Sequence, residues 1–532
     1  MSAKPARRGG QPRTAASRHG HPTKHGQEQL QRENDRLRQE NEQLRRKVFE
    51  RDQQIADAEK QLADAEKQIA DLERQLALCQ RNSTNSSKPP SSDGLAGEQR
   101  PRGRKDKSKR KPGGQPGHAG HHRPLAPLDK VSVIEVVLPK QCGHCGRNLP
   151  QQPDQVTTQG EPRRHQVTEV PPVKAHITEY QFPNVVCDHC GEATRLPLSE
   201  EIAGHFGPQL TALIAYLTVV CRLPRRLVEA MLADVLGIEI SLGSTQKAWE
   251  EVSQAVAQPV GQLQEQLPNQ TRFNVDETGW RTNGDKRWIW VLVASQFAFY
   301  IVAAHRNTEV LVSLLGTIFR GILCSDRLPV YLKYHSGKMQ LCWAHLKRAL
   351  RGILDHPQSL EGERFARDAL AQYARLFRLW WKFRAGLINR PQLIDRSKRI
   401  KSKFRSLAVA YWDSCDREVA NLANAFGEHL KRLFTFLEEP GVEPTNNAAE
   451  QALRTAVQWR KISFGNRSRR GEIAIGRLLT VAQTCRMQPR HVLGYLASAV
   501  ECHRCRTPVP HLLSPETKYL NCYAGQRPQS HY

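Results

Sequence analysis

Residues 272–280 read RFNVDETGW, and we interpret them as a short strand that ends at an acid, Asp276. The following residues, 288–304, contain two runs in which large apolar side chains recur at every second position. A period of two is typical of strands, so these runs predict two strands joined by a tight turn. An apolar segment at 309–319 then predicts a helix.

A further strand is predicted at residues 321–326, GILCSD, and it ends at Asp326. The predicted order is therefore β-β-β-α-β, with a carboxylate at the end of the first and fourth strands. Two such carboxylates on neighbouring strands point into one site, and such a pair can hold a divalent metal ion. Aspartate is also common in turns, so the alternative is that Asp276 and Asp326 are ordinary turn residues.

A third acid lies far downstream, in residues 443–454 (EPTNNAAEQALR), which predict the start of a helix after a proline. Thr445 or Asn446 can serve as the N-cap. Glu450 on this helix would bring a third carboxylate to the two aspartates. The alternative is an ordinary ion pair with Arg454, four residues along the same helix face.

The charge of the whole chain points to its partner. The 532 residues contain 79 Lys and Arg against 53 Asp and Glu, a formal net charge of +26. Such an excess predicts a polyanionic partner, nucleic acid first and an anionic membrane surface second. The 13 cysteines do not form a dense even framework, and residues 288–304 are too short and too interrupted for a membrane span. We expect a soluble, intracellular, nucleic-acid-associated protein.

The N-terminal residues separate into a basic tail at 1–26 and a heptad array at 27–80. The tail serves either solubility or DNA contact. The two seams of the array are residues 30, 37, 44, 51, 58, 65 and 72 and residues 34, 41, 48, 55, 62, 69 and 76. This a/d pattern predicts a coiled coil that makes at least a homodimer, with Asn34 and Asn41 setting the register. The alternative is a solitary charged helix.

Residues 81–130 are rich in Pro, Ser and Gly and predict a disordered linker. Its cluster of cations predicts phosphate binding, with a merely solvated linker as the alternative. The cations are Arg100, Arg102, Arg104, Lys105, Lys107, Lys109, Arg110 and Lys111.

Two Cys-x-x-Cys pairs mark a small β-rich domain at 131–205, with strands expected at 131–138 and 167–182. The pairs are Cys142 with Cys145 and Cys187 with Cys190. Four thiolates at this spacing suit structural Zn²⁺, and a disulfide arrangement is the rival.

Helical segments flank the acidic strands. Residues 206–265 predict three short helices, either a helix-turn-helix or a collar that packs on the next domain. Segments 364–383 and 397–437 predict further helices, with Trp380, Trp381 and Phe383 as core. In the tail, Cys502 and Cys505 are free thiols or, less simply, part of a second metal site with Cys522.

The chain resembles the insertion-sequence-66 family of bacterial transposases across about residues 27–500. The matching motifs lie in the expected order: 85–93, the two Cys-x-x-Cys pairs, 275–280, 325–327, 342–348, 445–450 and 460–465 with Gly471. The resemblance implies an enzyme of the Asp-Asp-Glu (DDE) class with a ribonuclease-H-like α/β core. It also implies a bacterial protein that is cytoplasmic and associated with the nucleoid.

By this resemblance, Asp276, Asp326 and Glu450 are the catalytic triad and bind Mg²⁺ or Mn²⁺. Two such ions would promote hydrolysis at a transposon end and then attack of the freed 3′-OH on target DNA. We also expect DNA contact from Arg454, Arg460 and Lys461, and companion proteins of the same element are a further expected partner. His345 is either a residue that faces this site or a packed one.

Two other functions compete with that of a DNA transposase: a non-catalytic DNA-binding or architectural protein, and an inactive transposase relic. The expected architecture is multidomain: an N-terminal coiled coil, a zinc-binding domain, a helical domain, and a ribonuclease-H-like core with a helical insertion. The expected divisions are 1–26 tail, 27–80 coiled coil, 81–130 linker, 131–205 zinc-binding, 206–265 helical, 266–345 first part of the core, 346–440 insertion, 441–500 last part of the core and 501–532 tail.

Overall fold

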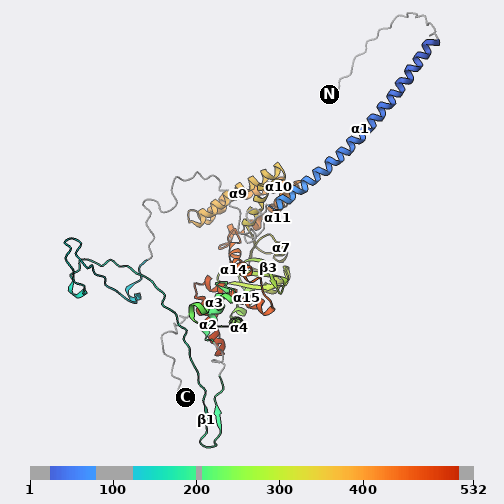
Figure 1. The fold of residues 1–532 in the computed structure, drawn as a ribbon. Coiled ribbons are helices and arrows are strands. Elements are labelled where there is room, and N and C mark those ends of the chain that lie inside the picture. Colours follow the sequence, from blue (N-terminus) through green and yellow to red (C-terminus); the bar gives the residue numbers. More distant parts are fainter. Residues whose placement is uncertain (1–23, 80–123, 199–205, 514–532) are drawn as a thin grey trace. The chain divides into compact units, whose positions relative to one another are not determined.

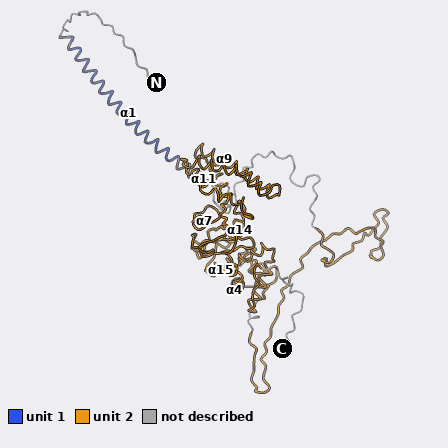
Figure 2. Tube along the Cα trace, turned by 180° about the vertical axis from the view of Figure 1, so that it is seen from behind, with its two compact units in different colours: residues 1–81 blue, residues 82–532 orange. Residues whose placement is uncertain are grey.

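The computed structural model describes residues 24–79, 124–198 and 206–513. The chain divides into two compact units, residues 1–81 and 82–532, and each is described by itself (Figure 2). The protein is multidomain and mostly helical, with a mixed β-sheet in its C-terminal part (Figure 1). Across the described ranges, no helix combines the length and the apolar character that crossing a bilayer requires.

The first unit contains one long helix, α1 (Lys24–Cys79), where the heptads predict one. Its described a and d leucines and isoleucines are exposed: Leu37 to 47%, Ile55 to 55% and Leu62 to 62%. An apolar stripe on a helix is normally buried against another element. Within the described part of this unit nothing covers the stripe.

Residues 124–198 differ from the predicted β-rich domain. Their strands are only β1 (Asn184–Val186) and β2 (Ala193–Arg195), which form an antiparallel hairpin. The segments predicted as strands at 131–138 and 167–182 are irregular, and no residue of 124–198 is buried. A two-stranded hairpin without a hydrophobic core is only marginally stable in water. Because these residues form no buried core, alternating apolar side chains are not enough to make 131–138 and 167–182 into strands.

The sheet of the C-terminal part has five strands in the order β5-β4-β3-β6-β7. The strands are β3 (Arg272–Thr282), β4 (Asp285–Val293), β5 (Ala298–Ala303), β6 (Ile322–Ser325) and β7 (Met339–Leu341). The first three form an antiparallel meander, and β6 and β7 run parallel to β3. The predicted β-β-β-α-β order is confirmed, with α6 (Thr308–Leu315) as its helix. This helix ends earlier than predicted because Gly316 takes φ +79°.

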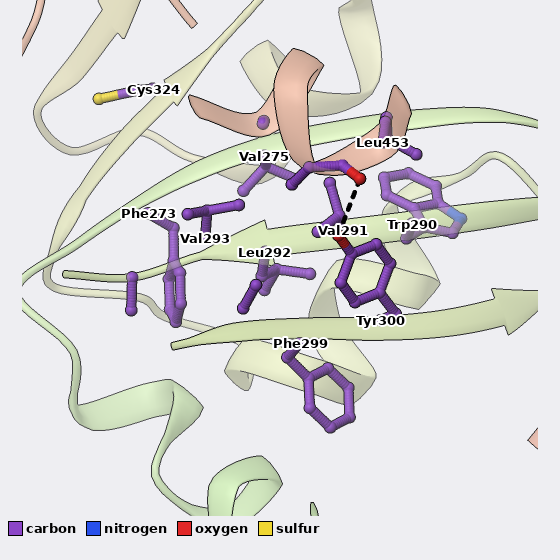
Figure 3. Close-up of a cluster of buried hydrophobic side chains, with 14 of the residues drawn as sticks. Phe273, Val275, Trp290, Val291, Leu292, Val293, Phe299, Tyr300, Cys324 and Leu453 are labelled. Atoms are coloured by element: carbon purple, nitrogen blue, oxygen red, sulfur yellow. Dashed lines mark hydrogen bonds between the residues drawn. The ribbon is translucent and has the colours of Figure 1, made fainter. Parts of the chain in front are cut away.

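Helices from the far end of the chain complete the core. α14 (Asn447–Ser463) packs on β3 and β4, and α15 (Arg469–Met487) packs on β5. In Figure 3, Leu453 of α14 lies beside Trp290 of the sheet. The Tyr300 hydroxyl donates a hydrogen bond of 2.9 Å to the Ala452 carbonyl (Figure 3). Residues more than 150 positions apart therefore share one apolar core.

The predicted helical region at 206–265 contains four helices rather than three. They are α2 (Pro208–Val219), α3 (Arg225–Leu236), α4 (Leu242–Ala255) and α5 (Ala257–Glu265). Both α2 and α4 pack on α16 (Val492–Arg504), and α4 also packs on α15. These are the contacts that the collar alternative predicts.

The insertion is helical, as predicted. It follows α7 (Pro329–Tyr334) and α8 (Trp343–Asp355), and comprises α9 (Leu360–Arg384), α10 (Arg390–Tyr411), α11 (Arg417–Glu428), α12 (Leu430–Leu433) and α13 (Thr435–Glu438). The predicted helix at 397–437 is thus broken, first where Asp416 caps α11. Trp380 is buried, but Trp381 is 62% exposed, contrary to its predicted place in the core. Adjacent residues of a helix point about 100° apart, so both tryptophans cannot face the same core.

Candidate active site

Asp276 lies in the middle of β3, not at a strand end as predicted. The strand continues to Thr282 because β4 pairs with it over its whole length from Asn274 onward. Its parallel pairing with β6 covers only Arg272–Asn274. Because β6 ends at Ser325, Asp276 lies one position beyond the part of β3 that β6 flanks.

Asp326 directly follows β6, as predicted. The parallel register pairs Asn274 with Cys324, so continuing it by two residues places Asp326 beside Asp276. The Leu328 backbone N–H donates a 2.9 Å hydrogen bond to Asp326 Oδ1 and holds the side chain. Two aspartates that are distant in the sequence thus meet at the edge where β6 stops.

Glu450 lies in the first turn of α14, and Asn446 places that turn against the sheet. Asn446 occupies the N-cap position, as predicted, but its side chain makes no capping hydrogen bond. Instead its Nδ2 donates to the Val275 carbonyl at 2.8 Å, and its Oδ1 accepts from Asn274 Nδ2 at 2.9 Å. Because Val275 precedes Asp276, these bonds bring the start of α14 to the site.

The ion pair of Glu450 with Arg454 is not among the contacts of the described residues. Glu450 instead contacts two side chains of α8: Arg348 at 3.5 Å and His345 Nδ1 at 3.6 Å. Arg454 is exposed. These contacts join α14 to α8, the helix that follows β7. A tertiary contact thus takes the place of the predicted Glu450–Arg454 ion pair within α14.

The site has an excess of negative charge around Asp276. Burial, followed by the charges of Glu277, Asp326 and Glu450, raises the pKa of Asp276 well above its usual value. Burial also raises the pKa of Asp326, although its hydrogen bond from Leu328 and the nearby charges of Arg306, Arg327 and Arg348 oppose the rise. A bound cation would stabilise a partly buried carboxylate that has other carboxylates around it.

Sequence reasoning gave no role to Glu277, although it follows Asp276 directly. Its side chain is buried, is paired with Arg306 at 2.5 Å and accepts a hydrogen bond from the Tyr331 hydroxyl. Burial raises the pKa of Glu277, while Tyr331 and Arg306 act against this rise. Its partners come from other elements, so the sequence held no local signal for them.

His345 faces the site, and Trp343 is packed. Burial, with Arg348 and Arg327 beside it, lowers the pKa of His345 to about 3, so its imidazole is neutral near pH 7. Trp343 is fully buried and donates a 2.6 Å hydrogen bond to the Leu433 carbonyl. Cys342, His345 and Glu450 each offer one donor atom, and these three atoms lie within 4.8 Å of one another. Asp276 and Asp326 are not part of that group.

The two cysteine pairs form similar turns but do not meet. Gly146 and Gly191 take φ +72° and +74°, and their N–H groups bond to the Cys142 and Cys187 carbonyls at 3.0 and 2.8 Å. Hydrogen bonds from the backbone N–H groups of the turn and from the second thiol lower the pKa of the first cysteine in each pair. Among the described residues, Cys142, Cys145, Cys187 and Cys190 do not converge as one four-sulfur cluster.

The predicted DNA-binding residues differ in whether they are described and in how exposed they are. The cation cluster at 100–111 lies outside the described residues, as does Cys522. Arg460 is half-buried and donates to the Gly279 carbonyl, so it ties α14 to β3. Lys461 is exposed in the last turn of α14. Cys502 lies in α16 with Cys505 just after it, and within the described ranges neither joins a group of metal-ligand type.

Partly buried acids beside the C-terminal end of β6, completed by a helix from far downstream, define a site of the acidic kind that nucleic-acid-processing enzymes use. Comparison with known proteins agrees: the family model described as "Transposase IS66 family" matches residues 203–473, about half of the chain, and includes all three predicted triad residues. The chain belongs to this family of transposases, which is of the DDE class.

Two further similarities add less. Residues 19–124 match a family of unknown function, DUF6444. A protein of Sinorhizobium fredii, "Uncharacterized protein y4jO", is 29% identical over 160 residues, which cover 29% of this chain and 45% of that protein. The chain thus matches less than half the length of this relative.

Proposed function

We propose that the protein is a DNA transposase that cleaves transposon ends and joins them to target DNA, with Asp276, Asp326 and Glu450 as its catalytic carboxylates. The observation that carries this proposal is the convergence of the three acids: the β3–β6 register places Asp326 beside Asp276, and the bond from Asn446 to the Val275 carbonyl brings the turn that holds Glu450 to the same strand. Burial and the neighbouring acids raise the pKa of Asp276, and a bound cation would favour its ionised form. Family membership supplies the reaction class.

The donor set fits Mg²⁺ or Mn²⁺. Carboxylate oxygens are the ligands that these hard cations prefer, and the three acids come from β3, from the residue after β6 and from α14. His345 Nδ1 is buried without a hydrogen-bond partner among the described residues and faces Glu450. When bound, divalent cations in such sites activate the attacking oxygen and stabilise the leaving oxygen of the phosphate. The strand order and the far-downstream α14 support a ribonuclease-H-like core.

The chain's own residues then hold the carboxylates in place. Arg348 orients Glu450, and the Leu328 N–H orients Asp326. Arg306 pairs with Glu277 and so offsets part of the negative charge beside Asp276. A neutral His345 is an acceptor or a ligand rather than an acid near pH 7, so we assign it a positioning role beside Glu450.

The test is a strand-transfer assay with the full-length protein and linear DNA that carries the ends of its own element. We expect cleavage and joining with Mg²⁺ or Mn²⁺ and neither with a chelator. Binding of the ends without any metal-dependent cleavage would reduce the protein to a DNA-binding subunit that needs companion proteins, or to an inactive relic.

DNA is the proposed partner, with the basic linker at 81–130, Arg454 and Lys461 contributing to phosphate contact. We also propose a structural Zn²⁺ held by Cys142, Cys145, Cys187 and Cys190. The support is that each pair already has the turn of a zinc knuckle, with a thiol whose pKa is lowered by backbone N–H groups. A protein with these partners would act on the bacterial nucleoid, in the cytoplasm.

We propose that α1 forms a parallel coiled-coil dimer, because its a and d side chains are exposed in one chain. Replacing both Ile55 and Leu62 with aspartate should make the protein monomeric, since two charges would enter the seam. Light scattering of the full-length protein measures this. The matched control replaces exposed Gln53 and Gln61, which lie off both seams, with aspartate and should stay dimeric. A dimer that persists in the seam variant would contradict the proposal.

A further inference from the structure

A second charged feature lies outside the candidate active site, in the helical insertion. A groove of about 810 Å³ runs between α9 and α10, which lie side by side (Figure 1). Cations dominate its walls, and no acid lines it. The six cations are Arg375, Arg378, Lys382, Arg396, Arg399 and Lys403.

The cations form two matching stripes. Each helix contributes three of them at the spacing i, i+3 and i+7, beginning at Arg375 on α9 and at Arg396 on α10. This spacing places side chains on one helix face and spans about 10 Å along the axis. All six residues are exposed, so their charged ends reach solvent.

These charges are not balanced by the protein. None of the six forms an ion pair with a residue that the structure describes, whereas other cations of the same helices do: Arg367 with Glu363, Arg384 with Glu443 and Lys398 with Asp395. Like charges on neighbouring helix turns destabilise a helix. Two facing stripes without counter-charges therefore raise the free energy of the unbound insertion, and an external polyanion would remove that repulsion.

The groove stands on a rigid support that is continuous with the candidate active site. Phe404 of α10 packs on Trp343 with ring centroids 5.0 Å apart, and Trp343 begins α8, the helix of Arg348 and His345. A capping box at Asn389 fixes the start of α10. A ligand in the groove would thus be held at a defined position on the same body as Asp276.

We propose that the groove between α9 and α10 binds the phosphate backbone of duplex DNA. This inference rests on the proposed function, because it adds a second DNA contact to the same protein. Duplex DNA carries a phosphate about every 3.4 Å along each strand, so a stripe of about 10 Å meets about three phosphates. A small anion would neutralise only part of two such stripes. An anionic membrane would meet a flat surface better than a groove between helices.

The test compares two matched triple variants of the full-length protein. The groove variant combines Arg378→Gln, Arg399→Gln and Lys403→Gln. The control combines Arg364→Gln, Arg405→Gln and Lys398→Gln, which remove the same charge from exposed positions of the same helices outside the groove. The readout is affinity for a duplex of about 30 base pairs as a function of salt, with circular dichroism to confirm folding.

Losing three phosphate contacts should reduce the slope of log affinity against log salt by about 2.7. If the groove variant and wild type bind DNA equally at 1 M salt, this change in slope makes the variant bind on the order of 100-fold more weakly at 0.15 M salt. The control should lose far less on both measures. Equal affinity and slope in the two variants would overturn the inference, and so would a groove variant that loses binding to phosphatidylserine vesicles but keeps DNA binding. If wild type binds DNA through the groove but never cleaves it, the proposed function fails while this inference stands.

Discussion

Replacing Asp276 with asparagine is expected to abolish metal-dependent cleavage and, at the same time, to raise the melting temperature in chelator. Loss of one carboxylate should remove several kcal/mol of transition-state stabilisation, a rate decrease of at least about 1,000-fold. The neutral amide keeps the shape but removes a partly buried charge that Glu277, Asp326 and Glu450 repel. Stabilising changes at such sites are typically worth about 0.5–2 kcal/mol.

The stabilisation should depend on pH. Because the folded pKa of Asp276 is raised, the folded state binds its proton more tightly than the unfolded state does. The resulting stability is fully present below the usual carboxyl pKa of about 3.9 and is lost as pH rises through the folded pKa. In chelator, the advantage of Asp276→Asn over wild type should therefore be larger at pH 8 than at pH 5.

Thermal unfolding at the two pH values measures this difference, and exposed Asp234→Asn serves as the control. The control should leave both cleavage and stability near those of wild type. Normal DNA cleavage by the Asp276→Asn protein would show that Asp276 is not a catalytic residue. An Asp276→Asn protein that is less stable than wild type in chelator at pH 8 would show that Asp276 is not a repelled, partly buried charge.

The second large effect is expected from Asn446→Ala. The side chain is 1% exposed and joins α14 to β3 through the Val275 carbonyl and Asn274. Its removal leaves a buried carbonyl and a side-chain amide without partners, which should cost about 2–4 kcal/mol of stability. It also frees the first turn of α14, so Glu450 shifts, and a misplacement of about 1 Å can reduce the rate about 100-fold.

Exposed Asn447→Ala, at the next position, is the matched control and should change little. Chemical denaturation gives the stability, and strand cleavage is measured at a temperature where both variants are folded. Normal cleavage by a folded but destabilised Asn446→Ala protein would show that this asparagine supports the fold without positioning Glu450.

Local patterns were enough to predict several elements. The period-two runs at 288–304 became β4 and β5, the heptads became α1, and Asp326 follows β6 as expected. In each case the deciding interactions lie within a few residues or in a hairpin, so side-chain period and turn chemistry are sufficient. The order of the three acids along the chain is likewise a property of the sequence.

Only the tertiary structure decided how those acids meet. Asp276 is interior to β3 because its hairpin partner is longer than its parallel partner β6. Glu450 contacts Arg348 of α8 rather than Arg454, its own neighbour in sequence. The tertiary structure likewise brings Glu277 to Arg306 and places the two cation stripes of α9 and α10 along one groove. Each of these contacts joins elements whose relative position depends on packing of the whole core, and no local period encodes that packing.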